Sequence, residues 1–146
     1  ENLNEKILIT ILITEKTMFM KYFEEISNLK LSDKNLETKK NEIFQLLSEN
    51  NFDMKNDLWF ENLFSENELN EIDILKRTHI ERIDEKDKEI FFHNIINNIR
   101  LPNLIKERDL IKEELLANND ASSKNLLLKF QNLNNEISNI QNKKID

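Results

Sequence analysis

The sequence predicts an all-α protein, with a compact helical bundle followed by a long kinked helix and a C-terminal antiparallel helical hairpin. Its 146 residues contain no glycine, no cysteine and one proline, Pro102. Average usage would give roughly ten glycines, which supply the positive φ angles of tight β-hairpins and phosphate-binding loops. Apolar residues recur at helical spacing along the chain. Composition and periodicity therefore favour the same helical architecture.

The first apolar segment, Ile7 to Ile13, is expected to be a buried helix, although its β-branched residues also suit a strand. Apolar residues repeat at helical spacing from Leu3, and no turn leads to a partner strand. Thr14 is expected to cap a second helix. The apolar face of that helix covers an arc of about 140°, formed by Met18, Phe19, Tyr22, Phe23, Ile26 and Leu29.

A third helix is expected after a loop with capping residues at positions 31–35, and Asn50 and Asn51 should end it. Its apolar stripe consists of Leu36, Ile43, Phe44 and Leu47. The aromatic stretch from Asp57 to Phe64 predicts a short helix or turn that closes one end of the core.

A capping box is expected at Ser65 and Glu68, which have the S-x-x-E spacing. The helix that starts there should run through Leu69, Ile72, Leu75, Ile80 and Ile83. Asp84 can then cap a long segment that reaches Asn118 and would extend about 50 Å if straight. Pro102 should kink this segment, because its ring crowds the carbonyl of Asn98.

The last two helices should form a hairpin, because the polar stretch 118–123 is short enough to make them antiparallel. The first carries an apolar arc of Leu101, Leu104, Ile105, Ile111, Leu115 and Leu116. The second carries a coiled-coil-like seam of Leu126, Phe130, Leu133, Ile137 and Ile140. We expect two subdomains, a bundle over residues 1–100 and a hairpin over residues 101–146.

Three leucines of this hairpin fall outside its seam. On a helical wheel Leu110 lies almost opposite its helix's apolar arc, and Leu127 and Leu128 lie about 100° and 200° from the seam. A two-helix hairpin has little core of its own, so such leucines indicate a partner-binding surface. The predicted partner contacts are Leu110, Leu127, Leu128, Phe130, Asn134, Ile137 and Gln141.

The sequence offers little material for catalysis, and we expect no catalytic, cofactor or metal site. Glu89 and His93, at i and i+4, could share a metal, but no other helix has a matching Glu-x-x-His pair, so an ion pair or helix contact is expected. His79 should be half-buried, and Trp59 is expected in the core rather than as a partner anchor. The neighbouring acidic pairs Glu24-Glu25 and Glu113-Glu114 should be solvated.

The charge and composition of the chain limit the classes of partner that it can bind. The formal net charge of −7 disfavours direct nucleic-acid binding, and the longest apolar run is too short for a membrane span. Without cysteine there are no disulfides. Helical character without a signal peptide favours the cytoplasm. Because the chain begins with Glu1 and not methionine, we expect it to be a piece of a longer protein.

The layout resembles the C-terminal helicase-binding region of bacterial DnaG-type replicative primases. Residues 5–13 resemble the first bundle helix of that region, and residues 104–110 and 127–137 resemble its closing hairpin. The resemblance implies that the hairpin docks on the N-terminal domains of a hexameric DnaB-type helicase at the replication fork, and that the bundle modulates helicase activity.

The resemblance further implies that primer synthesis, a nucleotidyl transfer, belongs to other domains of the parent primase. It also implies that this segment is monomeric by itself. The alternative is a structural helical protein that self-associates through the Leu126 to Ile140 seam and has no heterologous partner.

Overall fold

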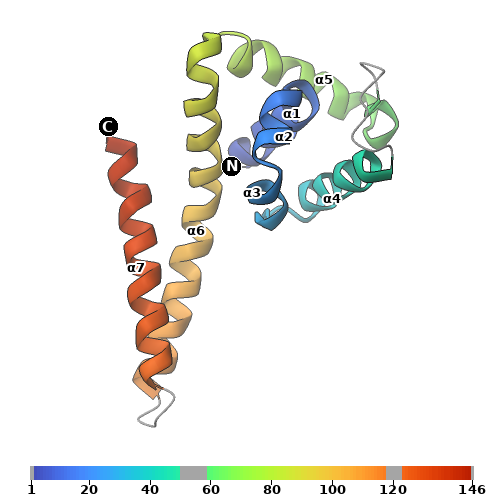
Figure 1. The fold of residues 1–146 in the computed structure, drawn as a ribbon. Coiled ribbons are helices and arrows are strands. Elements are labelled where there is room, and N and C mark those ends of the chain that lie inside the picture. The colour runs from blue at the N-terminus through green and yellow to red at the C-terminus, as the bar shows by residue number, and fades with distance from the viewer. Residues whose placement is uncertain (1, 50–58, 118–122, 146) are drawn as a thin grey trace. The chain divides into compact units, whose positions relative to one another are not determined.

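The computed structural model describes residues 2–49, 59–117 and 123–145, and these residues are helical with no strand among them. The helices are α1 (Leu3–Thr14), α2 (Lys16–Lys21), α3 (Phe23–Asn28), α4 (Lys34–Glu49), α5 (Glu66–Leu75), α6 (Lys88–Ala117) and α7 (Ser123–Ile145) (Figure 1). Three shorter turns are η1 (Glu61–Leu63), η2 (Lys76–Ile80) and η3 (Glu85–Asp87). The all-α prediction is confirmed.

The chain divides into two compact units, Glu1–Ile96 and Asn97–Asp146. The division falls inside α6, which is one helix and holds Pro102 in its interior. We refer to the first unit as the bundle and to the second as the hairpin, and describe each by itself.

Helix α1 is the buried centre of the bundle. Its apolar residues from Ile7 to Ile13 are at most 6% exposed, and α1 contacts α2, α4, α5 and η2. A helix that is apolar on all sides is stable only when other elements enclose it. The expectation of a helix here, against the β-branched propensity, is confirmed.

The predicted cap at Thr14 is wrong. Thr14 is the last residue of α1, and its hydroxyl donates back to the carbonyl of Thr10 at 2.8 Å. The N-cap of α2 is Glu15, whose side chain makes no cap hydrogen bond. A hydroxyl inside a helix can donate its hydrogen bond to the carbonyl one turn earlier, and Thr14 therefore does not cap the next helix.

The second predicted helix is two short helices, α2 and α3, which meet at Tyr22. Their aromatic residues pack as expected of a core face: the rings of Phe19 and Phe23 lie 5.8 Å apart, and they lie 5.1 Å and 4.8 Å from that of Phe44. At this break the ring of Tyr22 packs against Phe92 and His93 in the first turns of α6.

Two charged side chains are buried in the bundle, and the sequence pattern predicted neither. The carboxylate of Glu5, 7% exposed, accepts from the Ser32 backbone N–H at 2.9 Å, the Ser32 hydroxyl at 2.7 Å and the Asp33 N–H at 3.0 Å. The ammonium of Lys40 donates to the Leu29 carbonyl and lies 3.0 Å from the Glu37 carboxylate. Both charges hold the turn between α3 and α4, whose backbone groups would otherwise lack partners.

Helix α4 begins as the capping residues of the 31–35 loop predict. Asp33 Oδ1 accepts from the backbone N–H groups of Asn35 at 2.9 Å and Leu36 at 3.1 Å. Ile43 and Leu47 of the predicted stripe are buried. The predicted stop at Asn50 and Asn51 lies outside the described residues, as do Asp57 and Leu58 of the aromatic stretch.

The capping box of α5 is confirmed. Ser65 Oγ accepts from the Glu68 N–H at 3.2 Å, and Glu68 Oε1 accepts from the Ser65 N–H at 2.9 Å. This hydrogen bond to the Ser65 backbone lowers the pKa of the Glu68 carboxyl. Between α4 and α5, η1 is the predicted short turn, and the Trp59 and Phe60 rings meet edge to face at 5.7 Å. Trp59 is half-buried.

The predicted continuation of α5 through Ile83 is wrong. The α-helix ends at Leu75 and widens into the π-helical turn η2, and Ile83 lies beyond it. The wider turn still buries Ile80, which is 3% exposed. The predicted side-chain cap at Asp84 is also absent: its backbone carbonyl accepts from the Asp87 N–H at 2.8 Å, and its side chain makes no cap hydrogen bond.

Candidate functional site

The hairpin is held by an apolar seam between α6 and α7. Ile111 of α6 and three residues of the predicted α7 seam are at most 9% exposed, namely Leu133, Ile137 and Ile140. Leu126 and Phe130 are half-buried. The two helices run side by side in Figure 1.

Polar contacts at the edge of the seam fix the register of the hairpin. Arg100 Nη2 lies 3.4 Å from Glu136 Oε2, and Arg108 Nη1 donates to Asn134 Oδ1 at 3.3 Å. Arg100 and Glu136 both lie farther along the chain from the α6–α7 connection than Arg108 and Asn134 do. The two more distant residues pair with each other, as expected for antiparallel helices. Arg108 Nε also lies 3.2 Å from its neighbour Asp109.

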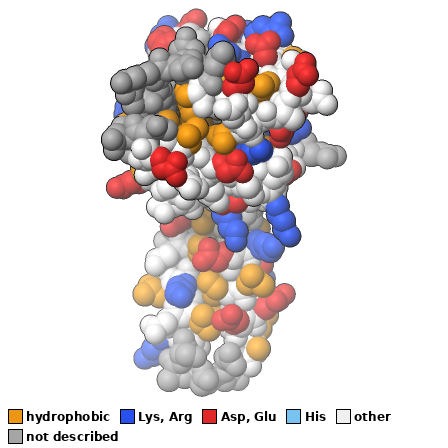
Figure 2. Space-filling model, turned by 90° about the vertical axis from the view of Figure 1, so that its right-hand side faces the viewer, with side chains coloured by type: hydrophobic (Ala, Val, Ile, Leu, Met, Phe, Trp, Pro, Cys, Tyr) orange, Lys and Arg blue, Asp and Glu red, His pale blue; other side chains and the backbone are white. Residues whose placement is uncertain are grey.

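The three leucines that the sequence placed outside the seam are exposed. Leu110, Leu127 and Leu128 are 55%, 48% and 58% exposed. Figure 2 shows hydrophobic side chains at the surface in the part of the molecule built from α6 and α7. Leu116, predicted on the apolar arc of α6, is 79% exposed, so that assignment is wrong. It lies in the last turn of α6, which ends at Ala117.

The other predicted contact residues lie in different environments. Gln141 is exposed, Asn134 is half-buried and accepts from Arg108, and Phe130 is half-buried in the seam. Ile137 is 3% exposed. The participation of all seven residues in partner binding stays a prediction.

The exposed leucines point in two directions. In a two-helix hairpin, seam residues of the two helices face each other, so residues opposite each seam face away from each other. Leu110 is nearly opposite the seam of α6, whereas Leu127 and Leu128 flank the direction opposite the seam of α7. Of the three leucines that the sequence placed outside the seam, one therefore lies on the α6 side and two lie on the α7 side, and Leu116 of α6 is exposed as well.

A cluster of polar side chains in the bundle centres on Tyr22, which is 7% exposed. Its hydroxyl donates to Glu89 Oε1 and lies 2.9 Å from His93 Nε2. Tyr22 thus has a hydrogen-bond partner at each of two residues one turn apart on α6. The predicted helix contact of Glu89 and His93 is therefore made through a third residue, which i, i+4 spacing could not reveal.

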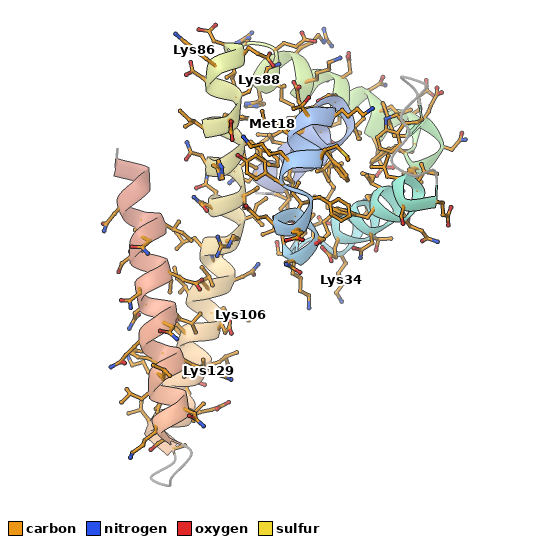
Figure 3. The ribbon with its side chains drawn as sticks, in the orientation of Figure 1. Met18, Lys34, Lys86, Lys88, Lys106 and Lys129 are labelled. Atoms are coloured by element: carbon orange, nitrogen blue, oxygen red, sulfur yellow. The ribbon has the colours of Figure 1, made fainter. Side chains whose placement is uncertain are left out.

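Charges around this cluster explain its pKa values. Lys21 Nζ lies 2.6 Å from Glu89 Oε1, and this contact, with the Tyr22 hydroxyl, lowers the pKa of the Glu89 carboxyl. Burial, together with the Glu89 carboxylate, raises the pKa of Tyr22 to about 12. Lys88, labelled in Figure 3, lies 2.9 Å from Glu15, and this hydrogen bond raises the pKa of its ammonium. These contacts attach the first turns of α6 to the rest of the bundle.

The Tyr22 cluster has the character of a structural attachment. A general base needs free access to a substrate proton, and here the Tyr22 hydroxyl, Glu89 Oε1 and His93 Nε2 are engaged with one another. No group of three or more potential metal-ligating side chains occurs within the described residues. His79 is half-buried, as predicted, and Glu24, Glu25, Glu113 and Glu114 are all exposed.

A hollow of about 220 Å³ lies between α1, the start of α4 and α5. Its polar groups are occupied by one another: Lys6 Nζ lies 2.7 Å from Glu71, and Glu68 accepts from Asn35 and from the Ser65 N–H. Asp33 also lines the hollow, and its carboxylate accepts from Asn2 Nδ2 and from the Asn35 and Leu36 N–H groups, while the rest of the wall is apolar. Since its polar side chains bind each other, the hollow offers no converging groups for a polar substrate.

Comparison with protein-family models, with curated proteins and with solved structures finds no match to this chain. Among the helices that the structure describes, none has an apolar stretch sufficient to cross a membrane.

Proposed function

We propose that this chain is a helicase-binding module of a bacterial DnaG-type primase. In this proposal the hairpin docks on the N-terminal domains of the hexameric DnaB-type replicative helicase and couples primer synthesis to the replication fork. The module has no chemistry of its own, needs no cofactor, and contacts the helicase while other domains of the parent primase contact the template. The bundle modulates the helicase.

The observation that carries the proposal is the exposure of the neighbouring leucines Leu127 and Leu128 on a hairpin whose seam is already filled. Each of these leucines is about half exposed, so it forgoes roughly half of the about 1.5–3 kcal/mol that complete burial of a leucine supplies, and a partner surface can recover that free energy. Single exposed apolar residues are common, but several on one small unit are typical of interaction sites. The resemblance of residues 5–13, 104–110 and 127–137 to the primase region supplies the identity of the partner.

The charge of the chain agrees with a protein partner. A net charge of −7 opposes the phosphate backbone of DNA, whose binding sites require lysine and arginine stripes. An acidic module can still serve a DNA-dependent enzyme if it binds the motor protein and leaves the template to its other domains.

The proposal is tested by calorimetric titration of the whole 146-residue chain with the N-terminal domains of the DnaB-type helicase encoded in the same genome. Saturable binding is expected, and charge substitution at Leu127 or Phe130 should weaken it. Phe130 is half-buried in the seam, so circular dichroism must show that the hairpin of that variant is intact. Absence of binding by the unsubstituted chain would overturn the proposal.

The second candidate function is a structural protein that self-associates. The sequence predicted that contact at the Leu126 to Ile140 seam, but Leu133, Ile137 and Ile140 are buried within one chain, so a second copy would contact the exposed leucines of the hairpin. The same exposed leucines favour it, because a second copy can also cover them. Light scattering separates the two functions: the helicase-binding module stays monomeric as its concentration rises, whereas the structural protein gains mass.

A further inference from the structure

We propose that the docking surface of the hairpin is the outer face of α7, formed by Lys124, Leu127, Leu128, Gln131 and Asn135, and that it fits an apolar groove with an acidic edge on the partner. This inference rests on the proposed function and goes beyond it, because it selects one of two candidate faces and states the partner's chemistry. Leu110, on the other side of the hairpin, takes no part.

The wheel of α7 places these five residues together. Taking Lys124 as the origin, Leu127 and Leu128 lie at about −60° and +40°, with Gln131 and Asn135 between them and the seam on the opposite side. All five residues are exposed in the structure. The face is therefore a continuous strip, two leucines wide, over three turns of a helix that its seam already holds in place.

A rigid strip of this kind suits recognition. The seam residues Leu133 and Ile137, at most 9% exposed, fix the rotation of α7, so the leucines are presented without a folding step. Gln131 and Asn135 add amide donors and acceptors beside the apolar residues, as the hydrogen-bonding rim of a helix-in-groove contact requires.

The charge on α7 indicates the sign of the charge on the partner's binding surface. Residues 123–145 contain four lysines and one carboxylate, Glu136, and that carboxylate pairs with Arg100. The five-residue strip holds a lysine and no carboxylate. By contrast, residues 1–96 hold 21 acidic and 13 basic residues. The strip is thus an apolar surface without negative charge on an otherwise acidic chain. An acidic edge on the partner's groove would complement the positive charge of Lys124.

The opposite face lacks this combination. Leu110 of α6 is flanked one turn away by both signs of charge, with Lys106 and Glu107 before it and Glu113 and Glu114 after it. Lys106, labelled in Figure 3, and these carboxylates are exposed. A single leucine within mixed charges offers less apolar area than the pair on α7, so Leu110 provides a matched control.

The test is a calorimetric titration of the whole chain with the helicase N-terminal domains, comparing Leu127→Ser/Leu128→Ser with Leu110→Ser. We expect the double variant to bind at least about tenfold more weakly and Leu110→Ser to bind within about twofold of the unsubstituted chain. Circular dichroism checks that each variant is folded. Lys124→Glu should weaken binding by a smaller factor, and added salt should reduce the difference between this variant and the unsubstituted chain.

The outcomes separate this inference from the proposed function. If the unsubstituted chain binds and the double variant binds equally well, or if Leu110→Ser loses as much affinity, the α7 face is overturned and the helicase-binding role stands. Tighter binding by Lys124→Glu would overturn the acidic groove edge. If the unsubstituted chain does not bind, the proposed function itself fails. A rise in mass with concentration that Leu127→Ser/Leu128→Ser abolishes would assign the face to a second copy of the chain and overturn the inference.

Discussion

The bundle and the hairpin differ in how completely their helices bury apolar surface. In the bundle, α1 is enclosed by other helices, and its residues from Ile7 to Ile13 are at most 6% exposed. In the hairpin, α6 and α7 bury one stripe against each other and leave leucines that are 48% to 79% exposed. Because exposure follows from the number of neighbours, stability is expected to depend on the bundle's interior and recognition on the hairpin's outer surfaces.

The largest effect should come from the centre of the bundle. Phe19→Ala removes a fully buried ring that contacts Phe23 and Phe44, and should lower the free energy of unfolding by about 3–5 kcal/mol. Urea denaturation followed by circular dichroism measures it. Met20→Ala, at the adjacent position that is 46% exposed, is the matched control and should cost less than about 0.5 kcal/mol. Equal losses would show that the bundle is not packed around these aromatic rings.

A charge inside the bundle should matter almost as much. Glu5→Ala leaves the N–H groups of Ser32 and Asp33 without their acceptor, and should reduce the free energy of unfolding by about 3 kcal/mol. The exposed Glu24→Ala is the control, with little change expected. A loss as small as that of Glu24→Ala would mean that water replaces the carboxylate at the start of α4.

Tyr22 gives the bundle a spectroscopic signal of its own, because it is the one tyrosine of the chain. Absorbance at alkaline pH should report a pKa of about 12 in the folded protein. Since the unfolded phenol ionises near 10, the unfolded state releases its proton first, and stability should fall by about 2 kcal/mol at most between pH 10 and 12.

Two variants sharpen the Tyr22 measurement. Tyr22→Phe should remove the phenolate signal and the stability loss above pH 10. Glu89→Gln should lower the Tyr22 pKa, because the carboxylate that opposes ionisation is gone. A pKa near 10 in the unsubstituted protein would contradict the hydrogen bond to Glu89.

The seam of the hairpin should respond more weakly than the bundle core. Ile137→Val removes one methyl group from a buried seam position and should cost about 1 kcal/mol. Hydrogen exchange should become faster in residues 123–142, while exchange in α1 is unchanged. Faster exchange in α1 as well would show that the two units unfold as one, contrary to the difference drawn between them.

The smallest effect on stability should come from the surface proposed for binding. Leu127→Ser/Leu128→Ser changes exposed side chains, so its free energy of unfolding should stay within about 0.5 kcal/mol of the unsubstituted chain. Thermal denaturation measures this directly. A loss above 2 kcal/mol would mean that these leucines support the hairpin and are not a free surface.

Local patterns in the sequence were sufficient for much of the fold. The Ser65–Glu68 spacing located the start of α5, and the four–three repeat from Leu126 to Ile140 located the α7 seam. Both depend on residues within one or two turns of each other. The exposure of Leu110, Leu127 and Leu128 was predictable for the same reason: a wheel fixes which side chains leave a seam.

Predictions that depended on distant residues fared differently. Thr14 and Asp84 have the chemistry of helix caps, yet neither side chain caps the next helix: Thr14 is still inside α1 and donates to the Thr10 carbonyl, and the side chain of Asp84 makes no cap hydrogen bond. The end of α5 was also misplaced, because the turn that buries Ile80 is π-helical. A periodicity of 3.6 residues cannot anticipate a turn that adopts another period.

The sequence by itself determined the helical class, the order of the helices and the leucines left outside the hairpin seam, because each of these follows from spacing along one helix. Only the tertiary structure decided that Tyr22 joins Glu89 to His93, that Glu5 and Lys40 are buried, and how the hairpin pairs Arg108 with Asn134. Glu5 and Ser32 are 27 positions apart, and Tyr22 and His93 are 71 apart. Hydrogen bonds depend on distance in space, and at such separations the chain's local pattern carries no record of it.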